Sequence, residues 1–157
     1  MANIIPDKIH IISVKLTNAN VTSDVSNDEF KQEESLKVSY SAETGFSEEG
    51  NNCQIKFTVN FSPDEDSAQG IQFSAEFTIV FVFVIDNLDE FKIPNDKVAN
   101  GFLIDSILGA TLMGIVYSTS RGIILTRTAG TILDSVILPV IDPAELLGNP
   151  IINDSEN

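Results

Sequence analysis

The chain has 157 residues, of which 23 are Asp or Glu and 9 are Lys or Arg, so its formal net charge at pH 7 is −14. This charge disfavours binding to nucleic acid and to anionic membrane surfaces, both of which attract clusters of Lys and Arg. The length is typical of one domain. We expect a single domain over residues 1–152 and a short acidic, disordered tail over residues 153–157.

The cysteine content and the N-terminal sequence favour a cytoplasmic location. Cys53 is the single cysteine, so no disulfide can form within the chain. The first residues, MANIIPDKIH, have neither the basic region nor the long apolar region of a signal peptide. The apolar run FTIVFVFVI is bounded by Glu76 and Asp86 and is too short for a spanning helix, so membrane insertion is not expected.

Alternating apolar residues predict three strands in the first part of the chain. Residues 9–21 form the first, with His10, Ile12, Val14 and Leu16 on one face. The polar residues 22–34 predict a connection that crosses between strands. Residues 35–41 form the second strand, residues 42–52 have the composition of a turn, and residues 53–61 (CQIKFTVNF) alternate without interruption.

A fourth strand is predicted over residues 72–86, and its two faces differ. The odd positions are apolar throughout, whereas the even positions change from polar residues to Val80, Val82 and Val84. An exposed strand with two apolar faces is prone to aggregation. We therefore expect these valines to be covered by a neighbouring subunit or by a bound polypeptide.

Helical spacing replaces alternation in the last third of the chain. Apolar residues recur every three or four positions from Ile104, and Gly130 is a suitable helix stop. Glycines within this region predict close approach of another element, since each costs about 1 kcal/mol relative to Ala in a helix interior. Asp142 as N-cap and Pro143 at the first helical position predict a short final helix.

The residues that could carry chemistry do not form a catalytic motif. His10 is the only histidine, and a structural or surface role is expected for it. The loop PDEDSAQG lacks the turn glycine and a ligand of a calcium loop. Gly109 and Gly114 have the spacing of a phosphate loop, but the Lys and Ser/Thr that bind phosphate and magnesium are missing. We therefore do not expect an enzyme.

Two further features have ordinary structural interpretations. Cys53 lies on the apolar side of its strand, where a free cysteine behaves as a small hydrophobic residue. Arg121 and Arg127 lie on a helix rich in small and hydroxyl side chains. They could pair with acids across a subunit interface, or they could be solvated.

The stretch YSTSRGIILTRTAGTILDSVILPVIDPAELL resembles the SecB family of protein-export chaperones. The family shows a helix with a tyrosine and an arginine, a stop at glycine, a Leu-Pro-Val-like loop and a final helix. Compatible positions are occupied here by Tyr117, Arg121, Gly130, Pro139, Val140, Ala144 and Leu146. About a quarter of the chain carries this motif, and the preceding strands agree with the family in order and alternation.

The resemblance implies an α+β fold, in which a four-stranded antiparallel sheet packs against a long helix with a short C-terminal helix. It also implies a homotetramer, built as a dimer of dimers. Such chaperones hold unfolded or export-bound polypeptides in apolar grooves, and some members deliver them to the motor ATPase SecA. The resemblance implies no cofactor and no use of ATP.

Carried over by position, the resemblance assigns two kinds of site. The polypeptide-binding groove would be lined by Val25, Phe30, Leu36, Val38, Tyr40, Leu146 and Leu147. Each of these could instead lie in an ordinary core. Motor docking would use Glu76, although Asn18 and Thr22 stand where the family carries acids. Some SecB-like proteins serve toxin–antitoxin systems, so an adaptor or a chaperone dedicated to one partner is the alternative.

Overall fold

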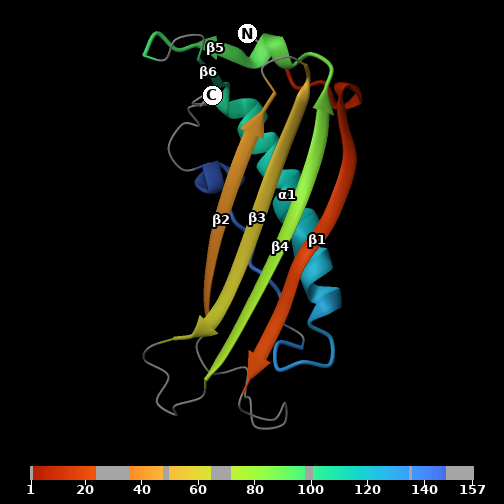
Figure 1. The fold of residues 1–157 in the computed structure, drawn as a ribbon, viewed down its shortest axis with the longest axis vertical. Coiled ribbons are helices and arrows are strands. Elements are labelled where there is room, and N and C mark those ends of the chain that lie inside the picture. The colour runs from red at the N-terminus through yellow and green to blue at the C-terminus, as the bar shows by residue number, and fades with distance from the viewer. Residues whose placement is uncertain are drawn as a thin grey trace.

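Four long strands form one antiparallel sheet in the computed structural model, which describes residues 2–23, 36–47, 50–64, 72–97, 101–134 and 136–147. The strand order is β1-β4-β3-β2 (Figure 1). The two edge strands are therefore consecutive in the sequence, as the predicted crossover requires. The strands are β1 (Ile9–Ser23), β2 (Leu36–Phe46), β3 (Asn52–Pro63) and β4 (Phe73–Ile85).

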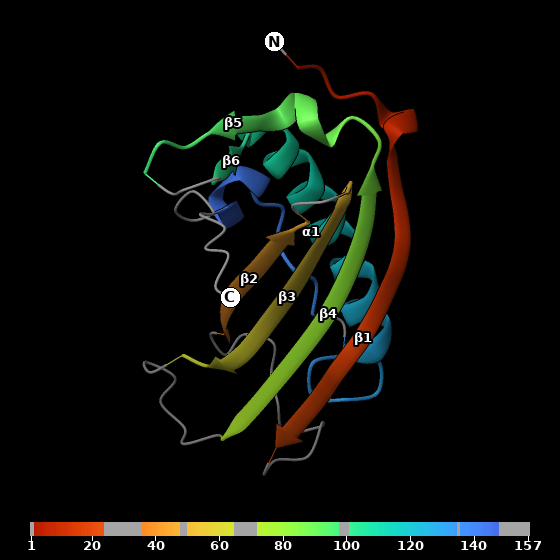
Figure 2. The same ribbon diagram turned by 45° about the horizontal axis from the view of Figure 1, so that its top comes forward.

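One long helix, α1 (Ser106–Arg127), covers one face of this sheet (Figures 1 and 2). We call the covered face the inner face and the opposite one the outer face. Alternate residues of β3 and β4 point inward, and large aromatic side chains among them are almost fully buried: Phe57, Phe61, Phe77, Phe81 and Phe83. The predicted α+β architecture, a four-stranded antiparallel sheet with a long helix behind it, is confirmed.

Strand β2 is longer than the sequence predicted. Residues 42–46 were assigned to a turn by composition, but they continue the strand and pair with β3 as far as Phe46 and Cys53. The physical reason is that Ala42, Thr44 and Phe46 keep the alternation of buried positions. Strand β3 begins at Asn52, so of residues 42–52 only residues 47–51 lie outside the two strands.

Two register shifts in β1 correct the predicted faces of that strand. At each shift one residue of β1, Ile12 or Thr17, has no partner in the register with β4. His10 pairs with Val84 on the outer face, whereas Val14 and Leu16 pair with inner-face residues, Phe81 and Ile79. The predicted common face for His10, Ile12, Val14 and Leu16 was therefore wrong, because a bulge exchanges the two faces.

Helix α1 begins with a side-chain cap and ends at Arg127, and Gly130 follows three residues later in the turn after the helix. The Asp105 carboxylate accepts a hydrogen bond from the Ile107 backbone N–H at 3.0 Å, so the helix begins after Asp105. Ile104, predicted as the first helical apolar residue, lies in a short strand instead. Gly130 has φ +77°, a left-handed conformation that stops helices after their last turn.

By length and composition α1 could cross a membrane, with a mean hydropathy of 1.3 in its most apolar window. Its buried residues, however, belong to the same hydrophobic cluster as the inner face of the sheet. The core helix of a folded domain meets the same criterion, so this property is weak evidence for a membrane span.

A small hairpin that the sequence did not predict precedes α1. The 3-10 helix η2 (Leu88–Phe91) leads into β5 (Lys92–Pro94), which pairs with β6 (Phe102–Ile104). Leu88 and Phe91 are buried and anchor the hairpin to the core. Strands of three residues are too short to show a period of two, which explains why only a connection was predicted.

After α1 the chain returns along the helix and ends its described part in η3 (Pro143–Leu147). The Asp142 carboxylate accepts a hydrogen bond from the Ala144 backbone N–H at 3.0 Å, which confirms the predicted cap. The final helix is a single 3-10 segment. A Cβ on Gly109 would lie 2.9 Å from Leu147 Cδ2, so this glycine permits the close approach that the sequence predicted.

Candidate functional site

The strand β2 and the 3-10 helix η3 bring together most of the predicted groove residues. Leu36, Val38 and Tyr40 lie at alternate positions of β2 and are half-buried. Leu146 and Leu147 are also half-buried and pack against the same hydrophobic core. Because η3 contacts both α1 and β2, these residues form one surface at the β2 edge of the sheet, here called the β2–η3 surface.

An aromatic cluster lies under this surface. The Tyr40 ring stacks on Phe57 with a centroid distance of 6.1 Å, and it meets Tyr117 of α1 edge-on at 5.7 Å. The Tyr117 hydroxyl donates to the Pro139 carbonyl at 2.6 Å. Because the Tyr117 hydroxyl has only one hydrogen to donate, Tyr40 must be the donor in the 3.4 Å contact between the two tyrosine oxygens. The cluster joins β2, α1 and the returning chain.

Burial raises the pKa of two groups in the core between the sheet and α1, Tyr117 and Cys53. Desolvation, followed by the hydrogen bond and charge of Tyr40, raises the pKa of Tyr117 well above its ordinary value. Burial also raises the pKa of the Cys53 thiol to about 12. Cys53 is 1% exposed, in agreement with its predicted place in the core. A neutral thiol is a poor nucleophile, and Cys53 pairs with Phe46 at the end of β2 away from Leu36, Val38 and Tyr40.

The remaining predicted site residues are not part of this surface. Val25 and Phe30 lie outside the described residues. Glu76 lies on the outer face of β4 and is exposed, and its carboxylate accepts a hydrogen bond from the Asn18 side chain at 2.6 Å. In register with Glu76 stand Asn20 of β1 and Asn60 of β3. The predicted docking residue therefore lies among neutral amides.

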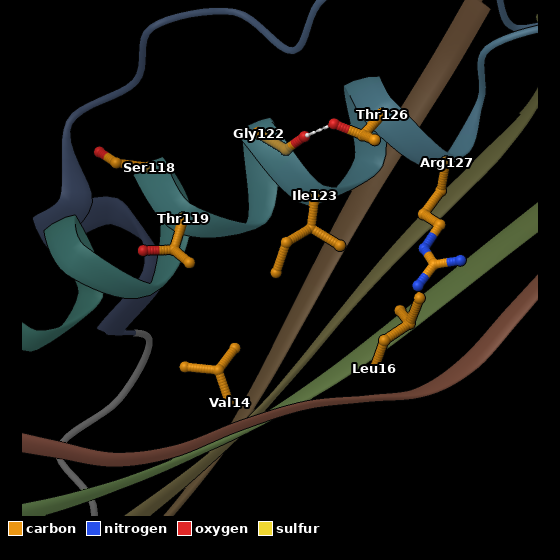
Figure 3. Close-up of a pocket in the computed structure, with 8 residues that line it drawn as sticks. All are labelled: Val14, Leu16, Ser118, Thr119, Gly122, Ile123, Thr126 and Arg127. Carbon is orange, nitrogen blue, oxygen red and sulfur yellow. Dashed lines mark hydrogen bonds between the residues drawn. The ribbon is translucent and has the colours of Figure 1, made fainter.

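A hollow between β1 and α1 was not predicted (Figure 3). Its volume is about 580 Å³, and it is lined by Val14, Leu16, Ser118, Thr119, Gly122, Ile123, Thr126 and Arg127. Among the described residues, no atom outside the adjoining backbone of α1 lies within 4 Å of a Cβ placed on Gly122, so the missing side chain leaves part of this space open. In the sequence, this hollow was indicated only by the small and hydroxyl residues of the helix segment YSTSRGIILTR.

The described residues contain no group of three or more His, Cys, Asp or Glu side chains that could hold a metal ion. His10 contacts Asp86 at 3.1 Å, and both side chains are about half exposed. This isolated surface pair agrees with the structural role that was predicted for His10. The main accessible features of the described residues are thus the β2–η3 surface and the hollow between β1 and α1.

Comparisons with known proteins bear on the fold. No protein-family model matches the sequence, and no curated protein matches it either. Among solved structures, the chain is similar to a SecB-like chaperone of Mycobacterium tuberculosis in complex with a ChAD peptide from an antitoxin. The TM-score is 0.60 at 11% sequence identity, and the match covers 86% of this chain and 91% of that chain. The predicted resemblance is thus confirmed for the fold, which is SecB-like.

Proposed function

We propose that this protein is a chaperone that holds non-native polypeptide segments on the β2–η3 surface, without ATP or a cofactor. The observation that carries this proposal is the half-buried apolar row Leu36, Val38 and Tyr40 on an edge strand, facing Leu146 and Leu147 in a SecB-like fold. The predicted contributions of Val25 and Phe30 belong to the same proposal. With its buried, neutral thiol the protein suits the cytoplasm, where we expect it to act.

The physical properties of the chain support this role. A surface that binds many sequences must keep apolar area accessible, and such area promotes self-association. The net charge of −14 opposes non-specific aggregation by mutual repulsion. Apolar contact is non-directional, so the β2–η3 surface suits segments that share hydrophobicity rather than sequence.

The test is an aggregation assay with two unrelated, chemically unfolded proteins, followed by light scattering. We expect the protein to slow aggregation of both at an equimolar subunit ratio. Val38→Asp should remove most of this protection, because it places a charge within the apolar row. Ser39→Asp is the matched control, since Ser39 is the exposed neighbour on the other face of β2. Unchanged aggregation in the presence of the wild-type protein would refute the chaperone role.

A chaperone dedicated to one partner is the second candidate. It is favoured by the similar Mycobacterium protein, which was solved with a peptide from an antitoxin. Affinity capture from the source cells separates the two possibilities. One stoichiometric protein supports the dedicated chaperone or adaptor, whereas a broad set of unfolded precursors supports the general one.

We further propose that the chain assembles as a homotetramer, a dimer of dimers. Support comes from β1, an edge strand whose Ile11 is 49% exposed and whose Val14 is 39% exposed beside the hollow with α1. A long apolar edge favours pairing with another chain. Size-exclusion chromatography with light scattering tests this, and a monomer at micromolar concentration would contradict it.

A SecA-type motor, if one is engaged, would dock at Glu76 on the outer face. The neighbouring amides and the hydrogen bond from Asn18 give this carboxylate a neutral setting. Glu76→Gln tests the docking role, because it removes the charge and keeps the shape. An unchanged affinity for the motor in that variant would exclude Glu76 as the docking residue.

A further inference from the structure

The outer face of the sheet carries an apolar hollow at the end opposite Glu76. Its volume is about 490 Å³, within the range of small binding pockets. Val82 and Val84 of β4 line it together with Ile12, which is 61% exposed. Gly45 of β2 also lines it, and a Cβ added there would meet no atom within 4 Å. A missing side chain and a bulged isoleucine thus shape the hollow, here called the valine hollow.

Within the described parts of the chain, no element covers this side of the sheet. Helix α1 lies on the inner face (Figure 2), and the three valines Val80, Val82 and Val84 remain half-buried among their strand neighbours. Single apolar residues on a surface are ordinary, but a grouped and concave set indicates an interaction site. The valine hollow is separate from the β2–η3 surface, which lies on the other side of the sheet.

Two lysines stand at one end of the valine hollow. Lys15 of β1 and Lys56 of β3 are both directly opposite Val80, and residues in direct register have Cβ atoms about 5 Å apart. Lys56 approaches Glu43 only to 3.9 Å, with both side chains well exposed, so this contact is weak. In a chain with 9 basic residues in all, two of them flank this apolar strip. At the opposite end stands the exposed Asp86.

We propose that the valine hollow docks a short acidic and apolar segment of a partner protein. A bulky apolar side chain of the partner fills the space over Val82 and Val84, and a carboxylate of the partner lies between Lys15 and Lys56. Val80 and Val82 are two residues apart, which is about 7 Å along a strand. The partner therefore carries its acidic residue two positions from the apolar one if extended, or about four positions away if helical.

The charges select this partner over others. A basic segment would be repelled by the two lysines, and Asp86 at the other end orients the acidic one. The overall charge of −14 disfavours a long polyanion such as nucleic acid, whereas a short segment at this end of the strip meets mainly the two lysines, because more distant charges are screened by salt. This inference does not depend on the proposed chaperone function, because it uses residues of the other face.

The experiment measures fluorescence anisotropy with two labelled synthetic peptides that share a central Trp-Leu pair and carry either flanking Glu or flanking Lys residues. We expect the full-length protein to bind the acidic peptide at least about tenfold more tightly than the basic one. Lys15→Glu with Lys56→Glu should reverse that preference. Lys37→Glu is the matched control, because Lys37 pairs with Ser62 on the same face of the sheet, far from the hollow. Higher salt should weaken binding of the acidic peptide.

Three results would overturn the inference. The first is equal binding of both peptides, or a preference that survives the double charge reversal. The second is that Val38→Asp abolishes binding of the acidic peptide while the double charge reversal does not. That result would assign the peptide to the β2–η3 surface. The third is self-association in sedimentation that Val82→Lys abolishes, which would assign the hollow to a second copy of the chain. These three measurements do not depend on the aggregation assay, so they can be interpreted even if that assay shows no chaperone activity.

Discussion

The inner and outer faces of the sheet share the same strands but differ in the size of their apolar residues. Along β4 the inner positions hold Phe77, Phe81 and Phe83, which are at most 1% exposed, whereas the outer positions hold half-buried valines. Large aromatic side chains need a permanent cover, which α1 provides within the chain. Small β-branched side chains tolerate exposure and suit reversible contact. Along β4, therefore, the size of the apolar residues distinguishes the side that α1 covers from the side that no described element covers.

Two neighbouring substitutions in β4 test whether the inner and outer faces contribute differently to stability. Phe81→Ala should lower the free energy of unfolding by about 3–5 kcal/mol, because it leaves a cavity in the core. Val82→Ala, one residue away on the outer face, should cost about 1 kcal/mol or less. Urea denaturation monitored by circular dichroism measures both. Equal losses would mean that the outer face is as permanently covered as the inner face.

Alkaline pH should lower the free energy of unfolding, because a thiol is buried on the inner face of the sheet. The pKa of Cys53 rises from 9.0 to about 12 on folding, so above pH 9 the unfolded chain loses a proton that the folded chain keeps. Stability is fully present below pH 9 and falls by about 1.4 kcal/mol per pH unit as the pH rises towards 12. Denaturant titrations at several alkaline pH values measure this slope. Cys53→Ala should reduce the slope, and an identical slope in that variant would show that other groups cause it.

Tyr117→Phe tests how the returning chain is attached to the inner face. Loss of the hydrogen bond of 2.6 Å to the Pro139 carbonyl should cost about 1 kcal/mol of unfolding free energy. Tyr40→Phe is the control and should cost less, because its contact with Tyr117 is longer, at 3.4 Å. Thermal unfolding of both variants gives the ranking. The opposite order would contradict the assignment of donors in this cluster.

Gly122→Ala tests whether a second copy of the chain covers the hollow between β1 and α1. The added Cβ meets no atom of the described residues within 4 Å beyond the adjoining helix backbone, so the helix should gain about 0.5–1 kcal/mol in stability within one chain. If a second copy covers this hollow, the same methyl group should weaken assembly. Thermal unfolding and light scattering measure the two effects separately. A loss of chain stability would mean that this glycine is needed within the fold itself.

Ser120→Ala should have the smallest effect. Ser120 is fully buried in α1, and its hydroxyl has no hydrogen-bond partner among the described residues. Replacing an unsatisfied hydroxyl by a methyl group should stabilise the chain by about 0.5 kcal/mol. Urea denaturation can resolve a change of this size in a paired comparison. A clear destabilisation would show that the hydroxyl has a partner in solution, such as a bound water molecule.

Regular alternation allowed most of the sheet to be predicted from the sequence. In β3 every second residue from Cys53 to Phe61 is apolar, and the buried positions follow that pattern without exception. The faces of β1 could not be predicted in this way, because the extra residues Ile12 and Thr17 are defined only by the pairing with β4. The hairpin of β5 and β6 was missed because three residues per strand carry no detectable period.

The candidate site was predictable where the family resemblance covered it. Leu146 and Leu147 were assigned through the motif that ends in PAELL, and η3 does lie against β2. The two hollows were not predicted, since each depends on residues that meet only in the folded chain. Gly122 and Val14 line one of them, and Gly45 and Ile12 line the other.

The two bulges of β1 also bear on how the length of this strand can vary. The first moves the inner positions from odd to even residue numbers at Ser13, and the second moves them back at Asn18. The Thr17 hydroxyl donates to the Thr78 carbonyl at 3.2 Å across the second bulge. Deleting Ile12 or Thr17 would therefore restore a regular ladder, whereas deleting Lys15 between them would displace its neighbours onto the wrong face. A deletion at Ile12 would also remove one wall of the valine hollow, whereas a deletion at Thr17 would leave that hollow unchanged.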